Sequence, residues 1–156
     1  MINIYPDVAY LSEPKVRGRL AGYLFLGSTP GKGEHIQLHI KIFVFCGIFQ
    51  LVMSSASESE VGAPFLNIKE GKLLCLALIE FGHTQLQTLL HCDNNSVSRI
   101  ANNRMKNQRP HSMEMQLFWV NDQVKRGDFY VQWHPGNANL ADYFTQRFDI
   151  NHHQDA

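Results

Sequence analysis

Four acidic residues occupy positions from which carboxylates could do chemistry together: Asp7, Glu60, Asp93 and Asp142. They belong to four separate segments of the chain. Carboxylates that gather in one place repel one another and raise each other's pKa unless cations neutralise them. A convergent set of four therefore indicates Mg²⁺ or Mn²⁺, hard cations that prefer oxygen ligands. Two such ions can activate a water molecule and stabilise the leaving oxygen of a phosphodiester.

The number of acids does not by itself establish a site. The chain holds 14 Asp and Glu residues, and most acids in proteins are solvated surface charges. An interaction module whose acids are surface charges is therefore an open alternative, and it predicts that the four carboxylates do not converge.

The first third of the chain has the pattern of strands. Residues 2–12 and 20–26 are rich in aromatic and β-branched side chains, and turn residues separate them. Period-2 alternation follows: Ile36, Leu38, Ile40 and Ile42 alternate with His35, Gln37, His39 and Lys41. This alternation predicts a strand with one buried and one wet face. The short connections favour an antiparallel meander.

A long helix is predicted from about residue 55 to Phe81. Ser55 and Glu58 have the spacing of a capping box, and apolar residues at helical spacing follow them. Pro64 lacks the amide that a helix interior requires, and glycines weaken the segment further. We therefore expect a kinked or irregular first turn.

The rest of the chain alternates strands with helices. We expect strands at 88–93 and 128–133, a helix capped by Asn94 or Asn95, a helix at about 111–126 with Met115, Phe118 and Trp119 on one side, and a short helix at 140–146. A meander continued by strand–helix alternation gives a mixed sheet with helices packed on it, an α/β domain. We expect one domain at 1–148 and a polar tail at 149–156.

Four strings carry a resemblance to a known family: PDVAYLSEPK at 6–15, MSSASESEVGA at 53–63, CDNN at 92–95 and WHPGNANLADYFTQ at 133–146. In this order they resemble the ribonuclease H domain of copia-type retrotransposon polyproteins, from about residue 2 to 148. The resemblance implies a ribonuclease H-like mixed five-stranded sheet flanked by helices. It also implies hydrolysis of the RNA strand of RNA–DNA hybrids with two Mg²⁺ ions, or Mn²⁺ in their place.

The family's metal-binding carboxylates fall on Asp7, Glu60, Asp93 and Asp142. Glu60 is preferred to Glu58 because it directly precedes the apolar helical run, whereas Glu58 stands where Ser55 needs a capping partner. A capping box of Ser57 with Glu60 is the competing structural interpretation. His134, in the loop before the last acid, resembles the histidine that assists metal and product turnover in ribonucleases H. An incidental loop histidine is the alternative.

Substrate contacts have a weaker signal. Residues 99–126 hold six basic side chains against two acidic ones, which suits phosphate tracking or a solvated helical face. We take Arg104 and Arg109 from this segment as candidates for nucleic-acid binding. Asn94 matches the family's Asp-Asn pair and is a candidate for the sugar edge, where the 2′-hydroxyl distinguishes RNA from DNA.

The chain also departs from the family pattern. Pro6 and Val8 flank the first acid where smaller residues are usual, Pro64 disturbs the helix that aims Glu60, and Gln146 stands where Lys is usual. A catalytically decayed remnant with weak nucleic-acid binding is therefore a further alternative. The polymerase motif Tyr-x-Asp-Asp is absent, so the expected partners are an RNA–DNA hybrid and the polymerase part of a retroelement polyprotein.

Composition excludes several other classes. The 156 residues carry zero formal net charge, which excludes phosphate affinity through bulk charge. Three cysteines without C-x-x-C spacing argue against a disulfide framework or a zinc ribbon. The longest apolar run, residues 42–53, is shorter than the roughly 20 residues that cross a bilayer. We expect a monomeric intracellular protein, cytoplasmic or nuclear, without a membrane segment or a targeting signal.

Overall fold

The computed structural model describes residues 1–15, 17–28, 37–48, 55–102 and 111–145. Its strands are β1 (Ile2–Glu13), β2 (Arg17–Gly27), β3 (Leu38–Ile48), β4 (Thr88–Cys92) and β5 (Phe129–Trp133). Its helices are α1 (Ala56–Glu80), α2 (Asn95–Ala101), α3 (His111–Lys125), the 3₁₀ turn η1 (Gly136–Ala138) and α4 (Asp142–Thr145). The predicted tail at 149–156 lies outside these residues.

The five strands form one mixed sheet in the order β3-β2-β1-β4-β5. The first three strands pair antiparallel as a meander, and β4 and β5 continue the sheet in parallel with β1. The predicted mixed five-stranded sheet flanked by helices is confirmed. Strand β1 lies where antiparallel pairing changes to parallel pairing, so its residues are direct neighbours of β4, which is remote in sequence.

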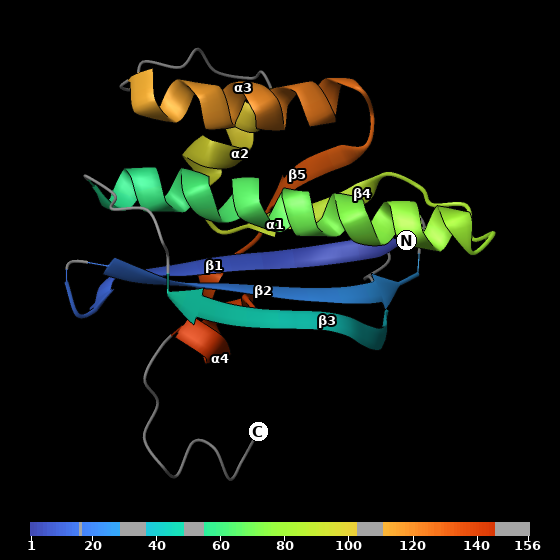
Figure 1. The fold of residues 1–156 in the computed structure, drawn as a ribbon, viewed down its shortest axis with the longest axis horizontal. Coiled ribbons are helices and arrows are strands. Elements are labelled where there is room, and N and C mark those ends of the chain that lie inside the picture. Colours follow the sequence, from blue (N-terminus) through green and yellow to red (C-terminus); the bar gives the residue numbers. More distant parts are fainter. Residues whose placement is uncertain (16, 29–36, 49–54, 103–110, 146–156) are drawn as a thin grey trace, which may run out of the picture.

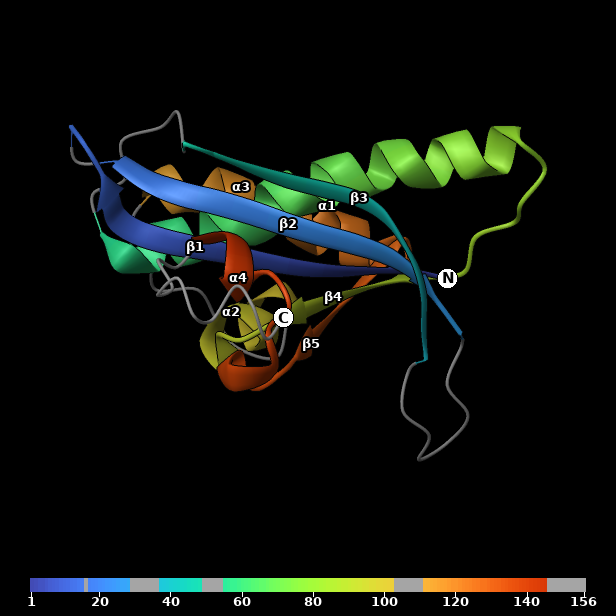
Figure 2. The same cartoon turned by 90° about the horizontal axis from the view of Figure 1, so that it is seen from below.

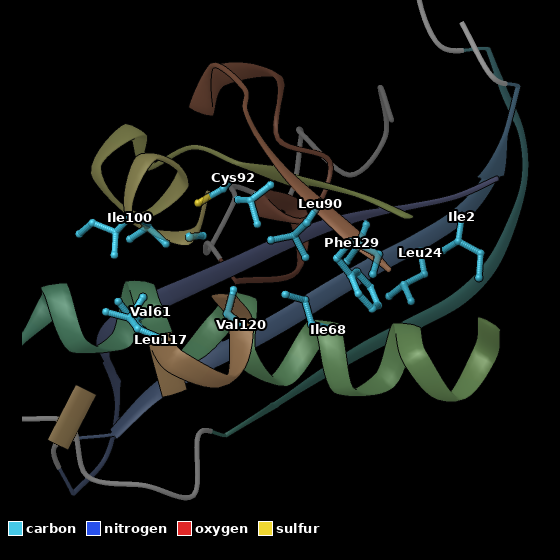
Figure 3. Close-up of a cluster of buried hydrophobic side chains, with 14 residues drawn as sticks. Ile2, Leu24, Val61, Ile68, Leu90, Cys92, Ile100, Leu117, Val120 and Phe129 are labelled. Atoms are coloured by element: carbon cyan, nitrogen blue, oxygen red, sulfur yellow. The ribbon is translucent and has the colours of Figure 1, made fainter. Parts of the chain in front are cut away.

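The helices divide unequally between the two faces of the sheet. Helices α1, α2 and α3 cover one face, and the short α4 lies on the opposite face (Figures 1 and 2). Figure 3 shows the main core, where Ile2, Leu24 and Leu90 from the sheet meet Ile68 from α1 and Val120 from α3. All of these side chains are buried. Packing in this core holds the sheet and α1 in a fixed relative position. The polar residues at the strand ends and at the start of α1 are therefore also held in place relative to one another.

Helix α1 is continuous, so the prediction of an irregular first turn is wrong. Ser55 caps it, and the Ser55 Oγ accepts a hydrogen bond from the Glu58 amide at 3.2 Å. Pro64 removes one backbone donor, but it is buried within a helix whose Val61 and Ile68 pack into the core. Burial of this face stabilises helical geometry more than one missing hydrogen bond weakens it.

The strand predicted from the alternation around residues 35–42 exists but extends to Ile48. Its expected buried face is only partly buried, because Ile40 is 63% exposed whereas Ile42 packs against the core. Strand β3 is an edge of the sheet, and its pairing with β2 shifts register between Lys41 and Phe43, next to Ile40. Ile36, the first apolar residue of the alternation, lies outside the described residues. This part of the prediction is wrong for a tertiary reason that local pattern does not contain.

The packed side of α3 also differs from the side marked by its largest apolar residues. Met115 and Phe118 are 79% and 67% exposed. Trp119 packs edge-on against Phe65 of α1, while Leu117 and Val120 are buried. No helix in the part of the chain that the structure describes has the length and apolar character needed to cross a membrane.

Candidate active site

Asp7 lies in the middle of β1, on the face of the sheet that α4 covers. Its carboxyl accepts a hydrogen bond from the hydroxyl of Thr145 and shares another with the carboxyl of Asp142. Desolvation raises the pKa of Asp7 to about 6, with the negative charge of Asp142 adding to the rise and the Thr145 hydrogen bond opposing it. The first predicted acid is therefore held against the fourth.

Asp93 directly follows β4, the parallel neighbour of β1. Desolvation raises its pKa, and the charge of Asp7 raises it further. The loop after β5 passes close by, since a Cβ added at Gly136 would lie 3.7 Å from the Asp93 Oδ2. Desolvation likewise raises the pKa of Asp142, and the charge of Asp93 adds to this. Asp7, Asp93 and Asp142 thus influence one another electrostatically.

Glu60 projects from the start of α1 and is held from α2. Its Oε2 accepts a hydrogen bond of 2.5 Å from the Nδ2 of Asn94. The helix begins after the Ser55 cap, so Ser57 lies inside it and the Ser57–Glu60 capping box is excluded. Of the two acids considered, Glu58 supplies the capped amide and Glu60 is the one directed to the site.

Three of the four acids line one pocket of about 70 Å³. Asp7, Glu60 and Asp93 share it with side chains of β1, α1 and β4, namely Pro6, Val8, Ala63, Pro64 and Cys92. Asp142 joins through its hydrogen bond to Asp7. The structure therefore places the four predicted acids in one region of the fold, three around this pocket and Asp142 beside Asp7. A larger cleft of about 150 Å³, between the second half of α1 and the start of β5, shares no lining residue with this pocket.

The donor set suits a hard divalent cation. All four groups offer carboxylate oxygens, and a cation between them would offset the repulsion and desolvation that raise the pKa values of Asp7, Asp93 and Asp142. Among the described residues, however, no three His, Cys, Asp or Glu side chains stand close enough to hold one ion. Ion binding would therefore require the carboxylates to approach further.

Asn139 and Thr145 are site residues that sequence analysis did not single out. The Nδ2 of the buried Asn139 donates to the carbonyl of Pro6 at 3.0 Å, and its Oδ1 accepts from the amide of Ala141 at 3.1 Å. These bonds tie the loop before Asp142 to the residue before Asp7. Both residues lie within the string at 133–146. The sequence signal available for Asn139 is that it is a polar residue three positions before Asp142, an acid at the start of a helix.

His134 packs among aromatic rings. Its ring meets Tyr5 and His91 edge-on, with centroid distances of 5.4 and 5.5 Å, and its Nδ1 lies 3.2 Å from the carbonyl of Pro135. His91 is buried, stacks on Tyr5, and has its pKa lowered to about 4 by desolvation and by the charge of His134. The predicted role of His134 in turnover stays a prediction.

Three residues are candidates for nucleic-acid binding: Asn94, Arg104 and Arg109. Of these, Asn94 lies within the described residues. Both ends of the Asn94 amide are engaged within the protein, because its Oδ1 accepts from the Val97 amide at 3.0 Å and caps α2. Of the two alternatives for this cap, Asn94 is the correct one. Arg104 and Arg109 lie outside the described residues. Arg99, in the last turn of α2, is exposed.

Comparison with solved structures identifies the fold. A ribonuclease H1 isolated from compost by a metagenomic approach, solved in complex with RNA/DNA hybrid, superposes with a TM-score of 0.63 at 12% identity, covering 92% of this chain and 93% of that one. Ribonuclease H1 of the halophilic archaeon Halobacterium salinarum gives 0.59 at 14% identity over 99% and 98% of the two chains.

A viral protein contains the same fold within a longer chain. The foamy viral protease-reverse transcriptase, in complex with RNA/DNA hybrid, gives a TM-score of 0.58 at 13% identity, and the match covers 92% of this chain but 19% of that one. No protein-family model matches the sequence, and no curated protein does. The chain has the ribonuclease H fold.

Proposed function

We propose that this chain is a metal-dependent endonuclease that hydrolyses the RNA strand of RNA–DNA hybrids. The observation that carries the proposal is the grouping of three carboxylates, from β1, α1 and the residue after β4, around one pocket, with Asp142 of α4 beside Asp7. Proteins of the same fold have been solved with RNA/DNA hybrid, which supports the substrate class by analogy of fold.

Asp7, Glu60, Asp93 and Asp142 would hold two Mg²⁺ ions, or Mn²⁺ in their place. Such ions supply an activated water and stabilisation of the departing 3′-oxygen. The chain's own contribution is placement: Asn94 holds Glu60, Thr145 holds Asp7, and Asn139 holds the loop before Asp142. Catalysis then rests on orientation and charge stabilisation and needs no covalent intermediate.

Other residues have supporting roles in this proposal. His134 assists turnover of metal and product from the loop beside Asp93. Arg104 and Arg109 contact phosphates of the hybrid. These roles follow the resemblance to ribonucleases H and the basic character of residues 99–126.

We infer a copia-type retrotransposon origin from the order of the four strings along the chain. The foamy viral protein supports this kind of setting, because there a ribonuclease H fold forms part of a chain that also carries a reverse transcriptase. A polymerase part is accordingly a candidate partner of this chain.

A catalytically decayed ribonuclease H fold is the second candidate. Two observations favour it: no three described carboxylates stand within reach of one ion, and Pro6 and Val8 stiffen the strand beside Asp7. Such a protein would fold and bind the RNA–DNA hybrid weakly but would not cleave it.

Incubation of the purified chain with a hybrid whose RNA strand is labelled tests the proposal. We expect labelled fragments in Mg²⁺, none after chelation, and none from the same RNA in single-stranded form. A folded protein that binds the hybrid and releases no fragments in Mg²⁺ or Mn²⁺ would favour the decayed fold instead.

A further inference from the structure

Trp133 is a large apolar side chain that stays half exposed beside the acidic pocket. It ends β5, an edge strand of the sheet, and pairs in register with Cys92, which lines the pocket next to Asp93. Its exposed fraction is 50%. An indole in such a position leaves apolar surface in water, although the buried Val131 lies two residues away along the same strand.

The indole is fixed in orientation by a contact to the site itself. Its Nε1–H donates to the backbone carbonyl of Asp93 at 3.0 Å. Since the polar edge is thereby satisfied within the protein, what Trp133 offers to a ligand is the apolar, π-electron surface of the ring. No aromatic ring of the described residues packs on that surface, whereas the other tryptophan, Trp119, lies edge-on to Phe65.

We propose that Trp133 is a substrate-contact residue whose exposed ring packs against the sugar of a nucleotide next to the one held at the carboxylates. This inference rests on the proposed function. Successive nucleotides of a strand are only about 3.4 Å apart along a helix axis, so a phosphate at Asp93 brings a neighbouring nucleotide to the indole bonded to that residue. The sugars lie on the outside of a duplex, so an exposed aromatic ring can pack against one whatever the base sequence.

The chain offers an internal spectroscopic test because it has two tryptophans. In a Trp119→Phe variant, Trp133 is the sole indole, and the aromatic contact with Phe65 is retained. Adding Asp93→Asn removes a carboxylate needed for cleavage but keeps the backbone carbonyl that bonds Trp133. Titration of this double variant with a fluorescently labelled RNA–DNA hybrid, in Mg²⁺, follows the indole and the anisotropy of the hybrid together.

We expect the Trp133 emission to change with the same midpoint as the anisotropy, and Trp133→Ala to weaken hybrid binding about tenfold. Trp133→Phe, which keeps an aromatic face, should bind within about twofold of the wild type and controls for loss of fold. The matched Trp133→Phe/Asp93→Asn protein, in which Trp119 is the sole indole, should show no emission change.

Two results overturn the inference in distinguishable ways. Hybrid that binds by anisotropy while the Trp133 emission and the affinity of Trp133→Ala stay unchanged would refute the contact but leave the proposed function standing. Wild-type protein that neither binds nor cleaves hybrid would refute the proposed function and the contact together.

Discussion

Asn94 joins two parts of the site through the two ends of one amide: its Nδ2 holds the Glu60 carboxylate at 2.5 Å, and its Oδ1 caps α2 on the Val97 amide at 3.0 Å. The cap fixes the orientation of the amide, and the amide fixes Glu60. A substitution that keeps an acceptor for the Val97 amide but removes the donor to Glu60 separates the capping of α2 from the positioning of Glu60.

Asn94→Ser is such a change, because serine caps helices well but has no group to reach Glu60. We expect it to fold like the wild type and to need about tenfold more Mg²⁺ or Mn²⁺ for half-maximal thermal stabilisation, as is usual when a partner of a ligating group is lost. Asn94→Ala should in addition lose about 1 kcal/mol from the missing cap. Equal metal requirements in wild type and Asn94→Ser would show that Asn94 does not position Glu60.

In metal-free protein, Asp7 should contribute stability as the pH falls from 7 toward 5, whereas the buried His91, whose folded-state pKa of about 4 lies below its ordinary value of 6.5, should contribute a loss over the same range. The folded-state pKa of Asp7, about 6, lies above its ordinary value of 3.8, so the folded state binds the proton more tightly than the unfolded state does. Stability from this group is then gained as the pH falls through 6 and is complete below about 3.8. The difference in melting temperature between the wild type and Asp7→Asn, measured in chelator, isolates the Asp7 contribution, and it should move in favour of the wild type between pH 7 and 5. A difference that stays constant or moves the other way would contradict the raised pKa of Asp7.

Asn139→Ala should destabilise the fold by about 1–3 kcal/mol, because it leaves the buried carbonyl of Pro6 without its partner. It should also lower hybrid cleavage, since the loop before Asp142 loses its tie to β1. The exposed Asn137 in the same loop is the matched control, and Asn137→Ala should change stability by no more than about 0.5 kcal/mol. Chemical denaturation measures the stability and the cleavage assay measures the activity. If Asn139→Ala and Asn137→Ala changed both quantities equally, the Asn139–Pro6 hydrogen bond would not hold the loop to β1.

Gly71→Ala should destabilise the protein by about 1–3 kcal/mol although alanine is the better helix former. A Cβ at this position would collide with the Cδ1 of Ile4 and lie 3.5 Å from the Cε1 of Phe129. Ile4→Val removes that Cδ1, so the double variant should lose less than the two single losses combined. Strict additivity in denaturation experiments would mean that the clash is not the cause.

The sequence was sufficient for features that depend on local pattern. The first, second, fourth and fifth strands, the Ser55 cap of α1 and a cap of α2 at Asn94 or Asn95 are predicted close to their places, whereas the third strand is predicted to end near residue 42 and extends to Ile48. What made the four acids a set was the order of the family strings. Spacing does not show that β1 and β4 are neighbours.

Features that depend on distant contacts were not predicted. Asn139 meets Pro6 across 133 positions of the chain, and Thr145 meets Asp7 across 138. The exposure of Ile40 and the regularity of α1 around Pro64 likewise depend on which elements cover which surface. Local propensity yields to tertiary packing in these cases.

The most direct test of the account is hybrid cleavage by Asp93→Asn beside Asp128→Asn. Asp128 is a matched control: it precedes β5, forms an ion pair with Lys72 at 3.7 Å and lines the separate larger cleft. The account predicts Mg²⁺-dependent release of labelled RNA by the wild type and Asp128→Asn, and at least a hundredfold loss in Asp93→Asn, of the order seen when a group that stabilises transition-state charge is removed. Release by Asp93→Asn at the wild-type rate would contradict it.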